Sequence, residues 1–358
     1  MGRRRAGARG FSLLEVLLAA SLGVVVAAAL VQLFAATSRS NVLLSGEAAL
    51  QESVRHALDF LARSARGAGY LGCSSGVPLV NGLHGDWDRI VEVEIVVPVD
   101  GFDGGEGNRP EDWNPTLSAL PLRGVNVTGL AFRSANRIRT SGLRPGSDVI
   151  VFRRVAAPVH PLAAPWRTEG DPLTVIMGQD LALAADDFAL VSDCGQAALI
   201  RIGADAEVGT TTLSRPPGSG LFDNRPGPSL FASLEPFGDG DRPAAAAVAR
   251  IVTEIYFVAE GSGTDNRGDV VWSLWRKTST GRAVELVQGI DDMQILFGVD
   301  AVPDDGSSAP TRYVPPGSST APVRIVRLSL VASGVDAVAA DGRGLSRRFS
   351  RTLALRNR

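Results

Sequence analysis

The sequence predicts an α+β protein, with one long N-terminal helix packed on a mainly antiparallel β-sheet head. Three observations lead to this class. Residues 16–38 are apolar and carry no charge, helical spacing continues from there to Arg66, and after Tyr70 the pattern changes to short runs separated by turn-rich segments. A chain of 358 residues is long enough for one large domain or two modest ones.

The apolar run is long enough to cross a membrane. About 20 apolar residues at ~1.5 Å rise span the hydrocarbon core as a helix, and we place the transmembrane segment at residues 13–36. Arg3, Arg4, Arg5 and Arg9 precede the run, which predicts a cytoplasmic N-terminus. A secretory signal cut near residues 35–37 is the alternative, but the helical pattern continues beyond that point.

Glu15 is the only acid at the head of this run. An ionisable residue inside a membrane segment is costly and usually has a partner. Alternatively, Glu15 lies at the membrane interface in the first helical turn, where the helix dipole favours an anion.

The second part of the predicted helix is amphipathic. Apolar residues recur at intervals of three and four from Leu50 to Ala65, and charged residues occupy the other faces. Gly67 and Gly69 end the pattern. We therefore expect one helix over residues 11–66 whose second half docks on a sheet formed by the rest of the chain.

Alternating or apolar runs predict the strands of the head. They cover residues 90–97, 148–155, 173–176, 188–192, 197–202, 250–258, 270–276, 293–299, 323–332 and 347–355. Residues 101–124, 203–249 and 301–322 are rich in Gly, Pro, Asp and Ser and are expected to be long loops.

Charge and cysteine content limit the possible functions. The net charge is −2, so the composition is not that of a general nucleic-acid binder. The basic C-terminus, from Arg347 onward, suggests an edge strand protected by charge, or a patch that contacts DNA or an acidic neighbour.

Cys73 and Cys194 both follow the membrane segment and can form a disulfide if that part is periplasmic; two separate buried thiols are the alternative.

The N-terminal motif resembles the type IV prepilin signature. The motif is Gly10-Phe11-Ser12-Leu13-Leu14-Glu15, between a basic leader and an uncut apolar run. The resemblance implies that a prepilin peptidase cuts between Gly10 and Phe11 and that Phe11 becomes N-methylated. It also implies that Glu15 pairs with the N-terminal amine of a neighbouring subunit, so that two costly buried charges neutralise each other. Loss of residues 1–10 removes four arginines and no acid, and so changes the net charge from −2 to −6.

Later segments are similar to the PilW family of minor pilins. They are residues 55–63 with 68–73, 146–151, 192–198 (which include Cys194), 291–300 and 349–357. This resemblance implies a structural role in starting pilus assembly, and no enzymatic activity or cofactor.

The sequence also contains a possible hydrolase motif, three histidines and two acidic loops. Residues 72–76 fit G-x-S-x-G, but a nucleophile elbow needs a strand before it, and a helix is predicted there. His56, His84 and His160 lack metal-ligand spacing, so we assign no metal site. Two acidic loops could supply oxygen ligands for Ca²⁺, although acidic loops are usually only solvated. They contain Asp100, Asp103, Glu106 and Asp112, and Asp300, Asp304 and Asp305.

The expected organisation is a prepilin leader at residues 1–10, the helix at 11–66 and a periplasmic head at 67–358. The expected protein is a minor pilin of the inner membrane and of the pilus fibre or tip. Its expected partners are other minor and major pilins and the prepilin peptidase, and no nucleic acid. The alternatives are a J-type pseudopilin of a type II secretion system, and a membrane-anchored periplasmic adhesin or binding module.

Overall fold

A computed structural model describes most of the chain. The described residues are 12–72, 77–84, 95–105, 143–176, 183–203, 212–220, 223–226, 230–238, 245–278, 283–300, 310–319, 321–335 and 344–357, together with four two-residue strands between residues 121 and 138.

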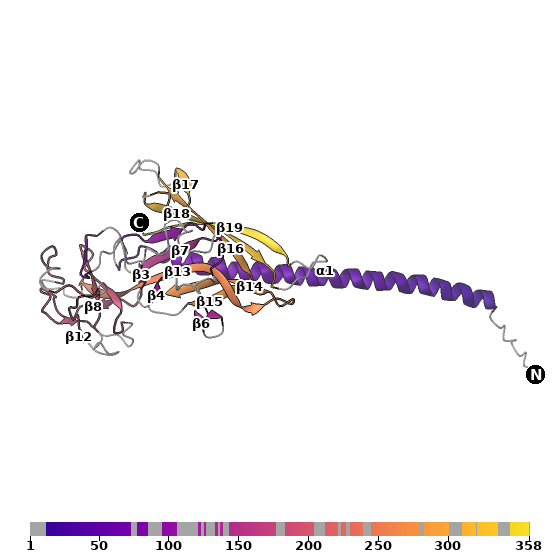
Figure 1. Ribbon diagram of the computed structural model, residues 1–358, viewed down its shortest axis with the longest axis horizontal. Coiled ribbons are helices and arrows are strands. Elements are labelled where there is room, and N and C mark those ends of the chain that lie inside the picture. Colours follow the sequence, from indigo (N-terminus) through magenta and orange to yellow (C-terminus); the bar gives the residue numbers. More distant parts are fainter. Residues whose placement is uncertain are drawn as a thin grey trace, which may run out of the picture.

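Helix α1 (Leu13–Gly67) dominates the shape of the molecule and projects far beyond the head (Figure 1). Its 55 residues correspond to a rod of about 80 Å. Ser12 caps the N-terminus. At the other end, Ala68 closes the last turn through its N–H, and Gly69 turns the chain away at a φ of +77°.

The head is built mainly from antiparallel strands. One sheet has the order β1-β11-β10-β13-β14-β15; β7 and β8 also pair with β13, and β2 pairs with β7. Its strands are β1 (Leu79–Asn81), β2 (Val99–Phe102), β7 (Val149–Val155), β8 (His160–Pro161), β10 (Phe188–Ser192), β11 (Ala197–Arg201), β13 (Ala247–Thr264), β14 (Val270–Thr278) and β15 (Val284–Gln288). Among these pairings only β1 with β11 is parallel.

A second sheet has the order β17-β16-β18-β19. Its strands are β16 (Ile290–Val299), β17 (Arg312–Val314), β18 (Val323–Ser333) and β19 (Ser346–Ala354). Short two-stranded pairs complete the described strands: β9 (Leu173–Thr174) with β12 (Thr212–Leu213), β3 (Pro121–Leu122) with β4 (Val125–Asn126), and β5 (Arg133–Ser134) with β6 (Arg137–Ile138).

The second half of α1 packs against both sheets, and the three form one core. This core contains Leu50, Val54 and Leu61 of the helix, Phe152 and Leu274 of the first sheet, and Val326, Leu328 and Leu330 of the second. In Figure 1 the C-terminal strands lie along one side of the helix and β14 and β15 along another. The sheets thus cover helix faces that would otherwise be exposed to water.

Gly289 is the single residue between β15 of the first sheet and β16 of the second, and its backbone hydrogen-bonds to both sheets. It stands between β15 and β16 with a φ of +78°, and a Cβ there would lie 2.5 Å from the carbonyl oxygen of Ser333. Its N–H donates to the Trp272 carbonyl in the first sheet at 2.8 Å, and its own carbonyl accepts from the Ser333 N–H in the second at 2.9 Å. Only glycine tolerates this conformation at such close approach.

Asp148 forms a second link between the sheets. The carboxylate, which is almost fully buried, accepts hydrogen bonds from the backbone N–H groups of Gly104 and Ile295, both at 2.7 Å. Beside it, the Ser147 hydroxyl accepts from the Met293 N–H at 3.0 Å. The start of β7 is thereby held against β16.

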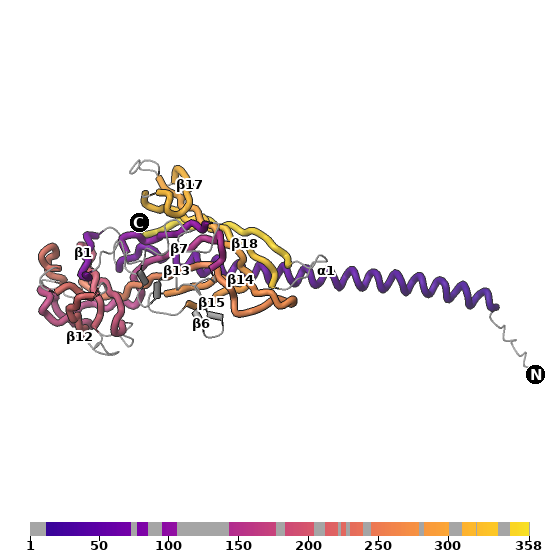
Figure 2. Tube along the Cα trace, viewed as in Figure 1, coloured from indigo at the N-terminus to yellow at the C-terminus, as the bar shows by residue number. Residues whose placement is uncertain are grey.

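Strand β13 has 18 residues and extends from the core around the helix into a distal lobe. Its first residues pair with β8 and β10 there, and its later residues pair with β7 and β14. The distal lobe has its own apolar cluster around Trp166, Phe237 and Val248. Figure 2 shows this lobe at the end of the molecule opposite the free helix.

The α+β class and the mostly antiparallel sheet are confirmed, but several predicted elements are wrong in detail. Ile95 and Val96 form a turn rather than the end of a strand at residues 90–97, and β2 begins at Val99, after Pro98, which has no N–H for a ladder. Residues 90–94 lie outside the described residues. The loops predicted at 101–124, 203–249 and 301–322 contain strand residues. The first contains the end of β2 and all of β3, the second contains β12 and the start of β13, and the third contains β17.

Candidate assembly surface

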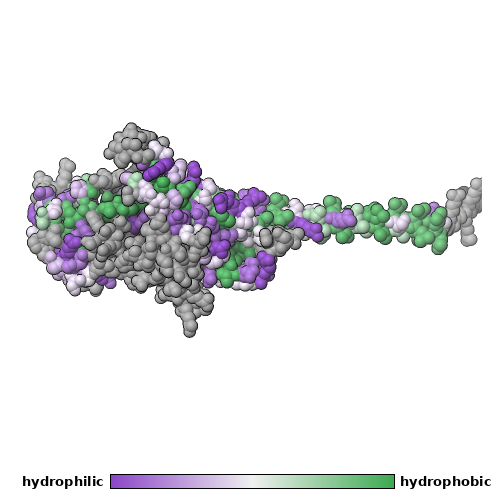
Figure 3. All heavy atoms as spheres, turned by 45° about the horizontal axis from the view of Figure 1, so that its top comes forward, coloured by the Kyte–Doolittle hydropathy of each residue, from purple (hydrophilic) through white to green (hydrophobic). Residues whose placement is uncertain are grey.

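The first part of α1 has no contact with the head that would bury it. The helix is long and apolar enough to cross a membrane, and none of its most apolar stretch is buried. Leu13 is 81% exposed and Phe34 is 76% exposed, and Leu50 is the first fully buried residue of the helix. The space-filling view shows the outer part of this rod as mainly hydrophobic with some polar patches nearer the head, whereas polar and apolar residues are mixed on the visible face of the head (Figure 3). Soluble monomers rarely expose a patch of this kind, so the surface requires lipid or protein around it.

Glu15 lies in the first turn of the helix and completes a capping box. The Glu15 N–H donates to the Ser12 hydroxyl at 3.2 Å, and the Ser12 N–H donates to the Glu15 carboxylate at 3.2 Å. This geometry fits the first-turn alternative for Glu15 and leaves its predicted role between subunits untested. Gly10 and Phe11 lie outside the described residues, so the cleavage and methylation positions remain predictions.

The docked half of α1 follows the predicted period with one change. Leu50, Val54, Leu61 and Ala65 are buried as expected, whereas Leu58 is only partly buried because Ala57 points into the core instead. Small residues at this face, such as Ala57, let the sheets approach the helix closely.

Two ion pairs fasten the C-terminal strand to the helix. Arg347 of β19 lies 2.7 Å from Glu47, and Arg351 lies 2.9 Å from Asp59. The hydrogen bond from Arg351 lowers the pKa of Asp59. Among the described strands β19 pairs only with β18, so it is an edge strand, as one reading of the basic C-terminus predicted. Two arginines of β19 therefore form ion pairs within the molecule.

Of the two cysteines, only Cys194 lies within the described residues. Cys194 lies in the turn between β10 and β11 at a φ of +71°, where the Asp193 carboxylate accepts from the N–H groups of Gly195 and Gln196. The described part of the chain contains no free thiol. Because Cys73 lies outside it, the predicted Cys73–Cys194 disulfide remains a prediction.

The other predicted chemistry finds little support. His56 is exposed beside Glu52 on α1, His160 begins β8, and His84 follows β1, where its N–H donates to the Asp223 carbonyl. Burial lowers the pKa of His160. Residues 73–76 of the G-x-S-x-G match are outside the described residues, and the element before them is α1 rather than a strand.

Of the three described carboxylates of the acidic loops, Asp100 and Asp300 form ion pairs, and no ion pair of Asp103 is seen within the described residues. Asp100 lies 3.6 Å from the Arg153 guanidinium, and the nearly buried Asp300 pairs with Arg324. No group of three or more His, Cys, Asp or Glu residues suited to a metal occurs within the described ranges. Glu106, Asp112, Asp304 and Asp305 lie outside those ranges.

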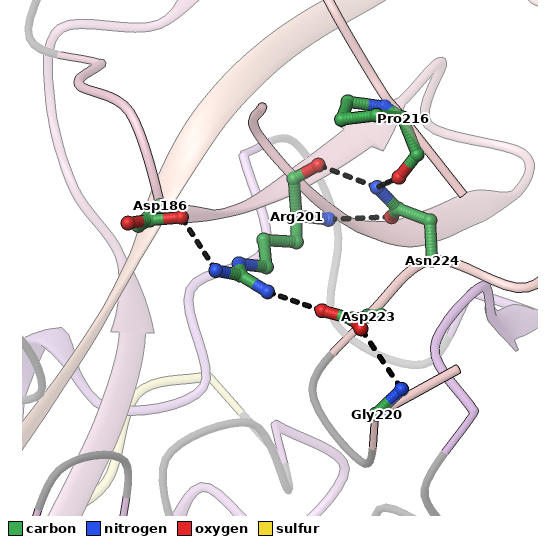
Figure 4. A network of polar contacts seen from close by, with 6 residues as sticks. All are labelled: Asp186, Arg201, Pro216, Gly220, Asp223 and Asn224. Carbon is green, nitrogen blue, oxygen red and sulfur yellow. Dashed lines mark hydrogen bonds and ion pairs between the residues drawn. The ribbon is translucent and has the colours of Figure 1, made fainter. Parts of the chain in front are cut away.

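The distal lobe contains a network of polar contacts around Arg201 that the sequence does not reveal (Figure 4). Arg201, at the end of β11, donates to Asp186 on one side and to Asp223 on the other. The side-chain oxygen of Asn224 accepts from the Arg201 N–H at 2.8 Å, and its amide nitrogen donates to the Arg201 carbonyl at 2.8 Å. The same nitrogen also donates to the Pro216 carbonyl at 3.2 Å. Asp223, Asn224 and Pro216 lie in the segment predicted only as loop, and Asp186 precedes β10, so no local pattern could have indicated the network.

Comparison with known proteins identifies part of the chain. Residues 255–354 match the family model described as type IV pilus-assembly protein W. Over this stretch the chain is similar to the PilW family. No curated protein and no solved structure matches the chain.

The PilW match includes most, but not all, of the strands that pack against the helix, because β7 lies outside it. It begins at Ile255 in β13, includes β14 to β18, and ends at Ala354, the last residue of β19. The match therefore includes the resembling segment at residues 291–300 and most of that at 349–357, while the segments at 55–63, 146–151 and 192–198 lie outside it. The chain is thus related to type IV pilus assembly, and its apolar helix could anchor it in a membrane.

Proposed function

We propose that this chain is a minor pilin of pilin-like architecture that helps to initiate assembly of a type IV pilus. The observation that carries the proposal is the division of α1 into an exposed apolar half and a half docked on PilW-family sheets. A docked second half gives the apolar rod a defined direction relative to the head. The same rod can then be held in lipid before assembly and packed against other helices in a fibre.

Energetic considerations support two successive environments for the rod. Each large apolar side chain gains about 1.5–3 kcal/mol on full burial, so sixteen exposed ones between Leu13 and Leu44 cannot remain in water. The inner membrane first surrounds these side chains with lipid, with the N-terminus cytoplasmic and the head periplasmic. In the fibre, helices of major and other minor pilins pack against them instead.

Processing at the N-terminus belongs to the same proposal. A prepilin peptidase removes residues 1–10, and the new terminus at Phe11 is methylated. Ser12 already caps the helix in the structure, so cleavage before Phe11 leaves the capping box with Glu15 intact. Glu15 then lies four residues from a free amine and can meet the amine of an adjacent subunit.

The N-terminus of protein recovered from membranes tests this function. We expect mass analysis to find a chain that begins at methylated Phe11 and retains residues 13–36. Gly10→Ala should abolish cleavage and leave the band unshifted when the peptidase is present, whereas Gly7→Ala in the same leader should be cut normally. A mature chain that begins beyond residue 36 would refute the proposal, because the protein would then be merely exported.

A further inference from the structure

The pocket where α1 ends carries an unusual excess of positive charge. It measures about 540 Å³ and is lined by Arg63, Arg66, Arg154, Arg276 and Arg356. Among the described residues of its wall, Glu254 is the only carboxylate. A pocket of this size falls in the range of small-molecule sites.

The arginines reach the pocket from separate elements of the fold. Arg63 and Arg66 are one turn apart on α1, and Arg356 follows β19. Arg154 of β7 and Arg276 of β14 stand on the face of the first sheet that packs against the helix: Arg154 is paired with Val252 of β13, Arg276 with Tyr256. A helix dipole favours Arg66 in the last turn but does not explain the other four.

Glu254 forms a hydrogen bond and ion pairs with other residues of the pocket wall. Its carboxylate accepts from the Ser64 hydroxyl at 2.8 Å and lies 3.3 Å from Arg276 and 3.7 Å from Arg154. The Ser64 hydroxyl also bonds the Tyr256 hydroxyl at 2.8 Å. Through Glu254 this network links Arg154 and Arg276 to Ser64 of the helix.

Three arginines of the pocket have no carboxylate of the described residues within ion-pair distance, although Asp59, one helical turn before Arg63, interacts with Arg63 electrostatically. Arg63, Arg66 and Arg356 form no ion pair with any part of the chain that the structure describes, and the Arg63 guanidinium rests 5.5 Å above the Phe60 ring. Guanidinium groups bind carboxylates and phosphates in a two-pronged geometry, and their mutual repulsion is relieved by such an anion.

We propose that this pocket binds a small organic oxyanion, a phosphate ester or a polycarboxylate. A lipid headgroup of the anchoring membrane does not fit, because Arg66 lies about 40 Å along the helix from Arg39, the first charge after the apolar run. The site is therefore one for a ligand of the periplasmic side. It does not depend on the minor pilin role, and its failure would leave that role intact.

Calorimetry on the full chain in detergent micelles tests the site. Inorganic phosphate and citrate are titrated separately at constant ionic strength, against a chloride blank. We expect saturable binding of at least one of them, weakened at least about tenfold in R63Q/R66Q, which loses two charged donors. R55Q removes an exposed arginine of the same helix outside the pocket and should bind like the wild type. Binding of phosphate alone identifies a phosphate ester as the ligand class, and binding of citrate alone identifies a carboxylate.

Two results overturn the proposal. One is the absence of saturable heat with both anions. The other is equal binding by R63Q/R66Q and the wild type, which would place the anion elsewhere. The urea midpoint of each variant without anion checks that the head is folded. R356Q, at an exposed position after the last strand, provides a second pocket variant if the helix pair fails that check.

Discussion

Glu15 is the residue on which assembly is expected to depend. In the structure its carboxylate caps its own helix, and in a fibre it would instead face the amine of an adjacent subunit. An unpaired buried charge left by removal of its partner costs about 3–5 kcal/mol, which corresponds to at least ~100-fold in an equilibrium constant.

Glu15→Ala should therefore insert into the membrane normally but fail to enter filaments. The amounts of protein in sheared filaments and in the membrane fraction measure the two steps. Glu52→Ala, at an exposed position of the same helix, is the matched control and should assemble like the wild type. Wild-type levels of Glu15→Ala in filaments, with the variant as the sole copy, would contradict the role.

Asp148 makes the stability of the head depend on pH. Burial raises the pKa of Asp148 to about 7, against the opposing effect of the N–H groups of Gly104 and Ile295. The unfolded chain releases this proton near the ordinary value of 3.8, whereas the folded chain retains it up to about 7. Stability from this group is therefore lost as pH rises between about 4 and 7, by an amount on the order of a few kcal/mol.

Asp148→Asn should remove this component of the pH dependence. We expect the difference in unfolding free energy between wild type and variant to fall from pH 5 to pH 8, as followed by urea unfolding with tryptophan fluorescence. Asp171→Asn is the matched control, because backbone hydrogen bonds lower the pKa of the exposed Asp171 and it stays charged throughout this range. If the difference in unfolding free energy between wild type and Asp148→Asn does not change with pH, the pKa of Asp148 is not raised in the folded protein.

At the scale of elements, α1 combines two surfaces with different requirements. Its second half is one face of a packed core, so its side chains contribute to the stability of the head. Its first half contributes nothing to that core, because none of it is buried.

Leu61→Ala should destabilise the head by about 2–5 kcal/mol, because Leu61 is fully buried between the helix and the sheets. Leu44→Ala removes the same atoms from an exposed position and should leave the urea midpoint unchanged. A similar midpoint for both variants would mean that the helix is not docked as the structure shows.

Across the whole molecule, β13 is the element that joins the core around the helix to the distal lobe. The predicted disulfide would add a second connection, from the helix exit to the β10–β11 turn that carries Cys194. Closure of a loop of roughly 120 residues stabilises a fold by up to ~4–5 kcal/mol in the chain-entropy model.

Peptide mapping of periplasmic material without reductant should link Cys73 to Cys194. Cys73→Ser and Cys194→Ser should each lower the midpoint of urea unfolding, and by the same amount, because each breaks the same bond. Two free thiols in the wild-type protein would rule the disulfide out.

The helix, its apolar half and most long strands follow from the sequence because they depend on near neighbours. The spacing of Leu50, Val54 and Leu61 is visible in any window of a few turns, and the alternation of Val326, Leu328 and Leu330 is equally local. The prepilin-like motif and the segment at residues 291–300 are likewise continuous in the chain.

Only the tertiary structure decided which surfaces these elements present to one another. The reversal at Gly289 assigns β15 and β16 to different sheets, and this places the helix against both. The Arg201 network and the arginine pocket at the end of α1 gather side chains from segments far apart in sequence. Charge and burial at such sites depend on distances across the fold, which residue order alone does not contain.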